Sequence, residues 1–128
     1  MIKIPVSVGE LIDKLSILQI KRNKIKDPEK LALVSKEFEF LYNLSSIYLN
    51  ESDIEKIYHE LVNVNNSLWE IEDKLRISEL HKDFNEEFIL LARNVYITND
   101  KRFELKNKIN LLTSSEIREV KDYVNYIN

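Results

Sequence analysis

The sequence predicts an all-α protein of about five helices, folded as a single helical-bundle domain over residues 1–128. One Gly and two Pro leave almost no turn residues for a multi-stranded sheet, which needs frequent hairpins. Apolar residues recur at steps of three and four through most of the chain, which is the period of an amphipathic helix. Ser, Thr or Asp residues precede several of these stretches, as helix N-caps do.

The first two helices are predicted from their N-terminal caps. Ser7-Val8-Gly9-Glu10 fits a capping box, and apolar residues recur from Val8 to Ile25. Asp27-Pro28 supplies a second N-cap with a proline at the first helical position, so the chain should reverse direction there. This second helix should end between residues 44 and 50. Residues 1–6 are expected to form an edge strand or an extended arm.

The next two helices should form a long antiparallel hairpin. Ser52-Asp53-Ile54-Glu55 fits another capping box, and Asp83 is the predicted cap of the helix that runs to Leu112. That helix, at roughly 29 residues, would be about 43 Å long, more than the diameter of a compact domain of this size. The other helices could cover only part of the hairpin, so we expect a homodimer. A slender monomer with short or bent helices is the alternative.

A short fifth helix is predicted at the end of the chain. Thr113-Ser114-Ser115-Glu116 has the sequence of a capping box. Apolar residues then follow at helical spacing: Ile117, Val120, Val124 and Ile127. The helix would pack its apolar face against the hairpin.

Composition excludes several classes of function. The chain has 19 basic and 22 acidic residues and a net charge of −3, which argues against nucleic acid or a membrane surface as a partner. The absence of Cys removes disulfides, thiolate catalysis and zinc–sulfur sites, and a cytoplasmic location is expected. The two His residues lack metal-ligand spacing and there is no Gly-rich phosphate loop, so neither a metal nor a cofactor is expected, and no catalytic residue can be named.

Polar residues lie close to the apolar stripes of the hairpin. If the turn is centred near Lys82, residues whose numbers sum to about 165 face each other across the two helices. This register places Arg93 opposite Glu72, Tyr96 opposite Trp69, and Asn99 opposite Asn65 and Asn66. Arg93 has no carboxylate three or four residues away on its own helix. We therefore predict an Arg93–Glu72 ion pair. Arg76, in contrast, has acidic neighbours within one turn that could pair with it.

These residues allow two interpretations. In the first, they form a pocket for a small anionic ligand, with Arg or Lys side chains as anion-binding groups and aromatic side chains as walls. In the second, they form a structural ion-pair network that fixes helix register or dimer pairing. The candidate ligand-binding residues are Asn65, Trp69, Glu72, Asp73, Arg76, Arg93, Tyr96, Asn99, Arg102 and Lys106.

Six segments spread along the chain form one combined pattern: Val8–Leu15, Ile17-Leu18-x-Ile20-Lys21, Val64–Asp73, Leu91–Arg102, Lys106-x-x-Ile109-Asn110 and Glu119-x-Lys121-x-Tyr123. In these segments the chain resembles a domain-of-unknown-function family of short all-helical bacterial proteins. The resemblance implies no established activity, and it implies genes that are sometimes found near those for surface-polysaccharide synthesis. On this basis we expect a non-catalytic interaction or accessory protein, linked to cell-surface glycan synthesis. The alternative is an enzyme or binding protein that takes a small anionic metabolite in the Arg/Lys-lined pocket.

Overall fold

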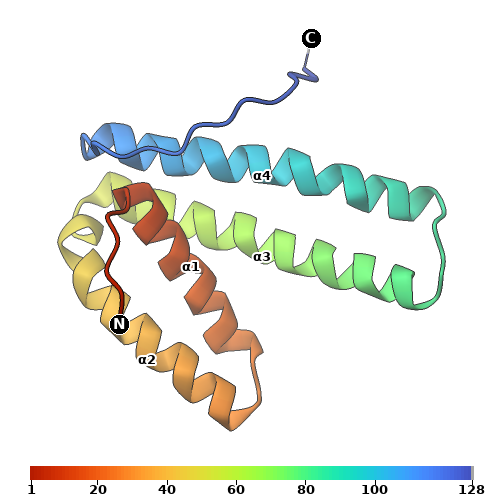
Figure 1. Cartoon of the computed structure of the whole chain (residues 1–128), viewed down its shortest axis with the longest axis horizontal. Helices are drawn as coiled ribbons and strands as arrows, with labels where there is room; N and C mark the ends of the chain where they lie inside the picture. Colours follow the sequence, from red (N-terminus) through yellow and green to blue (C-terminus); the bar gives the residue numbers. More distant parts are fainter. Residues whose placement is uncertain (128) are drawn as a thin grey trace.

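Residues 1–127 form four helices, two of which make one long hairpin. The computed structural model describes residues 1–127, in which no strand occurs. Figure 1 shows a helical pair, α1 (Val8–Lys24) and α2 (Pro28–Leu49), beside a longer pair, α3 (Ser52–Leu80) and α4 (Glu86–Leu112). The all-helical class is confirmed, but the expected count of five helices is wrong.

The helix starts follow their capping chemistry. The Ser7 hydroxyl accepts a hydrogen bond from the Glu10 backbone N–H at 3.0 Å, and Asp27 accepts one from Glu29 at 3.0 Å. α4 is capped by Asn85, whose side chain accepts from Phe88, so the predicted cap was two residues too early. α3 begins at Ser52 itself, with Glu51 in the N-cap position and no side-chain cap.

The predicted fifth helix does not form within residues 113–127, because its capping signal belongs to the end of α4. Ser114 adopts a left-handed φ of 52°, and the Ser115 N–H donates to the Asn110 carbonyl at 2.9 Å. The Ser114 N–H donates to Leu111, which completes a Schellman motif. The same Ser-rich sequence that could open a helix therefore closes one.

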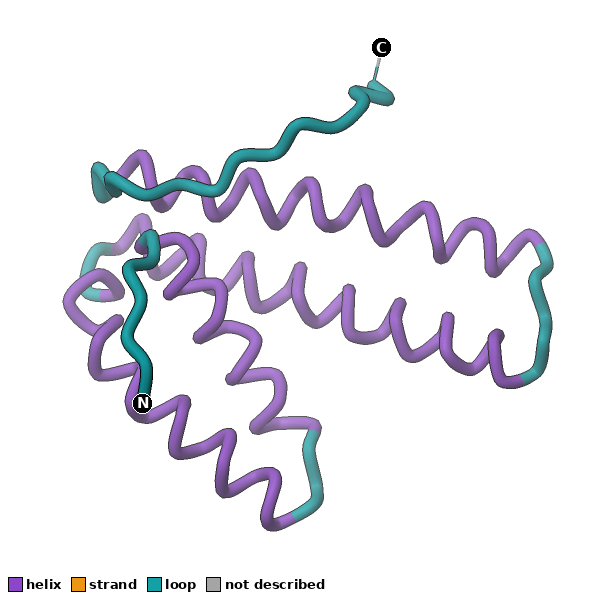
Figure 2. The backbone as a smooth tube through the Cα atoms, viewed as in Figure 1, coloured by secondary structure: helices purple, strands orange, loops and turns teal. Residues whose placement is uncertain are grey.

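Residues 113–127 instead form an extended C-terminal strap that runs back along α4 (Figure 2). The Glu119 carboxylate lies 2.7 Å from Lys106 Nζ, and the Tyr126 hydroxyl donates to Asp100 at 2.6 Å. The hydrogen bond to Asp100 raises the pKa of Tyr126 to about 12. The strap is thus attached to α4 by polar contacts, while its apolar side chains remain exposed.

The core lies where α1 crosses the open end of the hairpin, and Gly9 sets the separation there. A Cβ at Gly9 would overlap the Lys106 carbonyl oxygen and lie 2.8 Å from Asn110 Oδ1. The Gly9 N–H donates a hydrogen bond to Asn110 Oδ1 at 2.7 Å. The buried apolar residues of this core are Ile12, Leu15, Ile54, Ile57, Tyr58, Leu61, Leu105 and Ile109.

Outside the core, the hairpin and the N-terminal arm are open. Residues 1–6 are extended and exposed, which fits the predicted arm and not the predicted edge strand. Figure 1 shows the far part of the α3–α4 hairpin projecting beyond α1 and α2. Within residues 1–127, no helix combines the length and the apolar character that crossing a bilayer requires.

Candidate functional site

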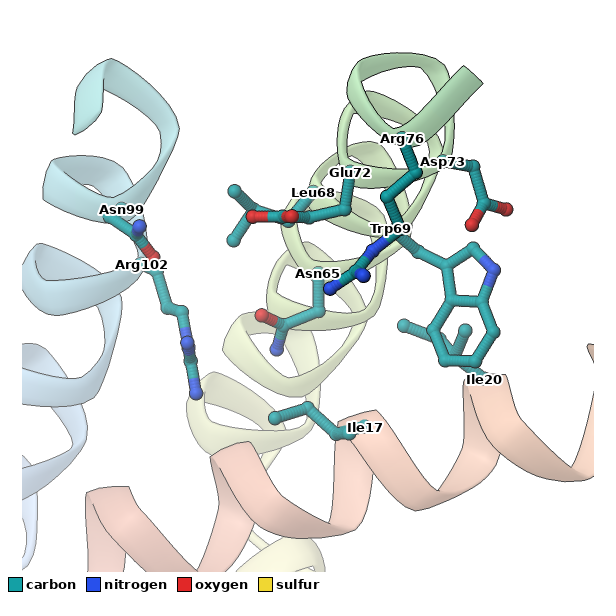
Figure 3. Close-up of a pocket in the computed structure, with 10 residues that line it drawn as sticks. All are labelled: Ile17, Ile20, Asn65, Leu68, Trp69, Glu72, Asp73, Arg76, Asn99 and Arg102. Atoms are coloured by element: carbon teal, nitrogen blue, oxygen red, sulfur yellow. The ribbon is translucent and has the colours of Figure 1, made fainter. Parts of the chain in front are cut away.

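An open cleft of about 480 Å³ lies between α1, α3 and α4. Ile17 and Ile20 of α1 form its floor, and Leu68 of α3 contributes to one wall. Most of the predicted candidate residues line it: Asn65, Trp69, Glu72, Asp73, Arg76, Asn99 and Arg102. Figure 3 shows the indole of Trp69 next to Ile20, with the α4 residues on the opposite side of the cleft. The predicted register, which sets Asn99 opposite Asn65, brings those two residues to the same cleft.

A buried carboxylate holds one wall of the cleft in place. Asp13, only 1 % exposed, accepts two hydrogen bonds from Arg102: from Nε at 2.9 Å and from Nη2 at 2.6 Å. Asn65 Nδ2 donates to the same carboxylate at 2.9 Å and to the Ser16 hydroxyl at 2.8 Å. The hydrogen bonds from Arg102 to Asp13 raise the pKa of the guanidinium, in spite of the opposing effect of burial. The bidentate pair therefore joins α1 to α4, and the Asn65 amide joins α3 to the same carboxylate.

Arg76 is the cation available for a ligand. Figure 3 shows its guanidinium on the cleft side of α3, between the side chains of Trp69 and Asn65. It forms no ion pair within residues 1–127, although Glu72 and Asp73 precede it by four and three residues. Figure 3 also shows Glu72 extending toward α4 and Asp73 extending away from it. Among the described residues, no group of three His, Asp or Glu side chains could hold a metal ion.

Lys106 lies outside the cleft, so its predicted role in the anion pocket is wrong. The residue is 6 % exposed, and its Nζ lies 2.8 Å from a Glu10 carboxylate oxygen and 2.7 Å from one of Glu119. Burial lowers the pKa of this ammonium, but the two carboxylates outweigh that effect and raise it. Lys106 therefore joins α1, α4 and the C-terminal strap in a structural ion-pair cluster.

Arg93 and Tyr96 also lie outside the cleft. Arg93 is exposed and forms no ion pair with Glu72 or with any other carboxylate in the described part of the chain, so the predicted pair is wrong. Leu91 lies on the half-buried side of α4. Arg93 follows it by two residues, which is about 200° around the helix axis, so the Arg93 side chain points away from α3. The ring of Tyr96 packs edge-on against the ring of Tyr126 in the strap, with 5.1 Å between the ring centroids, and not against Trp69.

Asp13 is the important residue that the sequence-based site omits. It lies on a stripe of α1 at steps of four, three and four residues, formed by Gly9, Asp13, Ser16 and Ile20, all of which are buried. No basic residue stands three or four positions from it in the sequence. A carboxylate on an inward-facing stripe without a local cation needs a distant partner. Arg102, which likewise has no acidic residue three or four positions away, meets that need.

The attachment of the strap leads to a first prediction. Glu119→Gln removes one of the two carboxylates on Lys106 and should lower the free energy of unfolding by about 1 kcal/mol, because the carboxylate is partly hydrated. The strap should detach more often, so trypsin should cleave after Arg118 and Lys121 several-fold faster. Glu116→Gln is the matched control, since Glu116 is exposed and unpaired among residues 1–127. Equal cleavage of the two variants would contradict the attachment.

The fold and the site define a helical protein with a polar, aromatic-walled cleft at the base of a long hairpin. The chain belongs to a family of unknown function (DUF6165), whose family model matches residues 2–128. No curated protein and no solved structure matches it.

Proposed function

We propose that this protein is a non-catalytic accessory protein that binds a small anionic, hydroxyl-bearing ligand in the cleft between α1, α3 and α4. The observation that carries the proposal is the position of Arg76, an unpaired cation on the cleft side of α3. A guanidinium without a carboxylate partner is free to form a bidentate contact with a phosphate or a carboxylate.

The other cleft residues support a ligand with hydroxyl groups. Trp69 offers an apolar ring face, and the Asn65 and Asn99 amides and the Glu72 carboxylate offer hydrogen-bonding groups around it. A sugar that carries a phosphate or a carboxylate has groups complementary to all of these. The resemblance to proteins encoded near polysaccharide genes supports sugar derivatives of cell-surface glycan synthesis as the ligand class.

The ion pairs support a binding role more than a catalytic one. Asp13 neutralises Arg102, and Glu10 and Glu119 neutralise Lys106, so these two cations serve mainly to hold helices together. The proposal also includes a cytoplasmic location, supported by the absence of Cys, and a homodimer, supported by the length of the hairpin.

Trp69 allows the binding proposal to be tested directly. It is the only Trp in the chain, so a ligand in the cleft should change the intrinsic fluorescence of the protein. We would titrate the protein with sugar phosphates, nucleotide sugars and uronic acids. At least one should give a saturable fluorescence change and a raised melting temperature.

Arg76→Gln should weaken that binding by about 10- to 150-fold, since a hydrogen bond to a charged group contributes about 1.5–3 kcal/mol. The stability of the free protein should stay within about 0.5 kcal/mol of wild type, because Arg76 is exposed. Arg93→Gln, on the same hairpin but outside the cleft, should bind as wild type does. Equal weakening by both substitutions would show that the cleft does not hold the anionic group.

A further inference from the structure

The α3–α4 hairpin has no closed core over most of its length. The buried side chains of α3 end at Asn65, and those of α4 begin at Leu105. Within residues 66–104, which we call the distal hairpin, no side chain is buried. The facing stripes, which include Leu68 and Leu75 of α3 and Leu91 of α4, are only half-buried. Two helices alone leave each apolar stripe open on its flanks, whereas four helices enclose it.

The chain exposes more surface than a compact protein of the same mass, and the difference is large enough to be buried in a dimer interface. The protein exposes 9296 Å², whereas a compact folded chain of 15.2 kDa exposes about 7,100 Å². The excess is about 2,200 Å², to which the exposed arm and strap also contribute. A standard interface buries about 800 Å² on each partner, and obligate homodimers bury more.

Large apolar side chains are exposed at the tip of the distal hairpin. Ile77 and Leu80 lie in the last turn of α3, Phe84 lies in the connecting loop, and Ile89 and Leu90 lie in the first turns of α4. Each is more than half exposed, and Leu80 reaches 76 %. Exposed charged residues surround them, namely Glu79, Lys82, Asp83, Glu86 and Glu87. Exposed apolar side chains with a polar rim are typical of interaction surfaces.

From these observations we infer that the distal hairpin binds a second copy of this chain, and that the two hairpins pack antiparallel about a twofold axis into a four-helix bundle. The inference rests on the homodimer of the proposed function and adds the surface that forms it. A second copy fits because it brings the same unclosed pair of apolar stripes, so that one interface completes both cores. The 15 α3 residues from 66 to 80 give an overlap of about 22 Å, or four turns. Trp69 and Arg76 within this stretch line the cleft beside α1, so the second copy would pack on the flank of the hairpin away from α1.

The test compares two pairs of exposed apolar residues by light scattering coupled to size exclusion. Wild type should have a mass of about 30 kDa, twice that of the chain. Leu80→Glu with Ile89→Glu should weaken association at least about 100-fold and give the 15.2 kDa species. Leu33→Glu with Ile47→Glu on α2, where both side chains are 71 % exposed, is the matched control and should remain dimeric.

Thermal melts give a second measure of association that does not depend on the shape of the molecule. The melting temperature of wild type and of the α2 control should rise with protein concentration, whereas that of the tip variant should not. A tip variant that stays dimeric, or dissociation caused by the α2 control alone, would overturn the proposed surface and leave the homodimer standing. A monomeric wild type would overturn both the proposed surface and the homodimer. The fluorescence titration of Trp69 would still test ligand binding in the cleft independently.

Discussion

Gly9→Ala is expected to lower the free energy of unfolding by about 3 kcal/mol or more. The new methyl group would overlap the Lys106 carbonyl and crowd Asn110, so α1 would have to move away from α4. The buried hydrogen bond from the Gly9 N–H to Asn110 would be lengthened or lost. Replacing Gly with Ala within a helix normally stabilises by up to about 1 kcal/mol, which is too little to offset these costs.

Chemical denaturation and thermal melts would measure this effect. In a chain of this length, 3 kcal/mol should appear as a melting temperature lower by about 10 °C. Gly9→Ala with Asn110→Ala should cost less than the sum of the two single changes, because the second change removes one of the two overlaps. A melting temperature at or above that of wild type for Gly9→Ala would show that the helices do not approach so closely.

Asp13→Asn should destabilise the protein by about 3 kcal/mol. The substitution keeps the shape of the side chain but leaves the Arg102 guanidinium without its carboxylate. Removing one partner of a buried pair costs about 3–5 kcal/mol. The lower end applies because the Arg102 side chain is 28 % exposed, at the edge of the cleft, and can be partly hydrated.

A double-mutant cycle separates the ion pair from the rest of the network. Asp13→Asn combined with Arg102→Gln should be less destabilising than the sum of the two single variants, with a coupling of about 2 kcal/mol. Arg76→Gln, which removes an unpaired cation of the same cleft, should change stability by no more than about 0.5 kcal/mol. Additive effects of the Asp13 and Arg102 substitutions would contradict the pair.

The helices could be predicted from sequence where their signals are local. Ser7 and Asp27 cap α1 and α2 as expected, because a cap depends only on the next three residues. The same local logic failed at Ser114 and Ser115, because Ser residues serve both the start of a helix and its end. Residues 113–127 are instead attached to α4 by contacts such as the ion pair between Lys106 and Glu119, whose partners are 13 residues apart. A capping pattern contains no information about such a partner.

The candidate site was predicted in part because helical hairpins have a regular register. The register placed Asn99 opposite Asn65, and both residues line the cleft in the structure. It failed for Arg93 because an exposed guanidinium is stabilised by water and needs no carboxylate. Asp13 and Arg102 do pair, although 89 residues separate them, because Asp13 has no access to water. Burial therefore decides which charges must pair, and burial follows from the packing of three helices.

The contact between Gly9 and Asn110 has a consequence for how the chain folds. Its partners are 101 residues apart, so the contact between α1 and α4 cannot form until α4 has been synthesised. The two helical pairs contain mostly local contacts and can form early, but the core that joins them must wait. Premature termination before α4 would thus leave Ile12 and Leu15 without Leu105 and Ile109, the α4 members of their core, and would expose an apolar surface prone to aggregation.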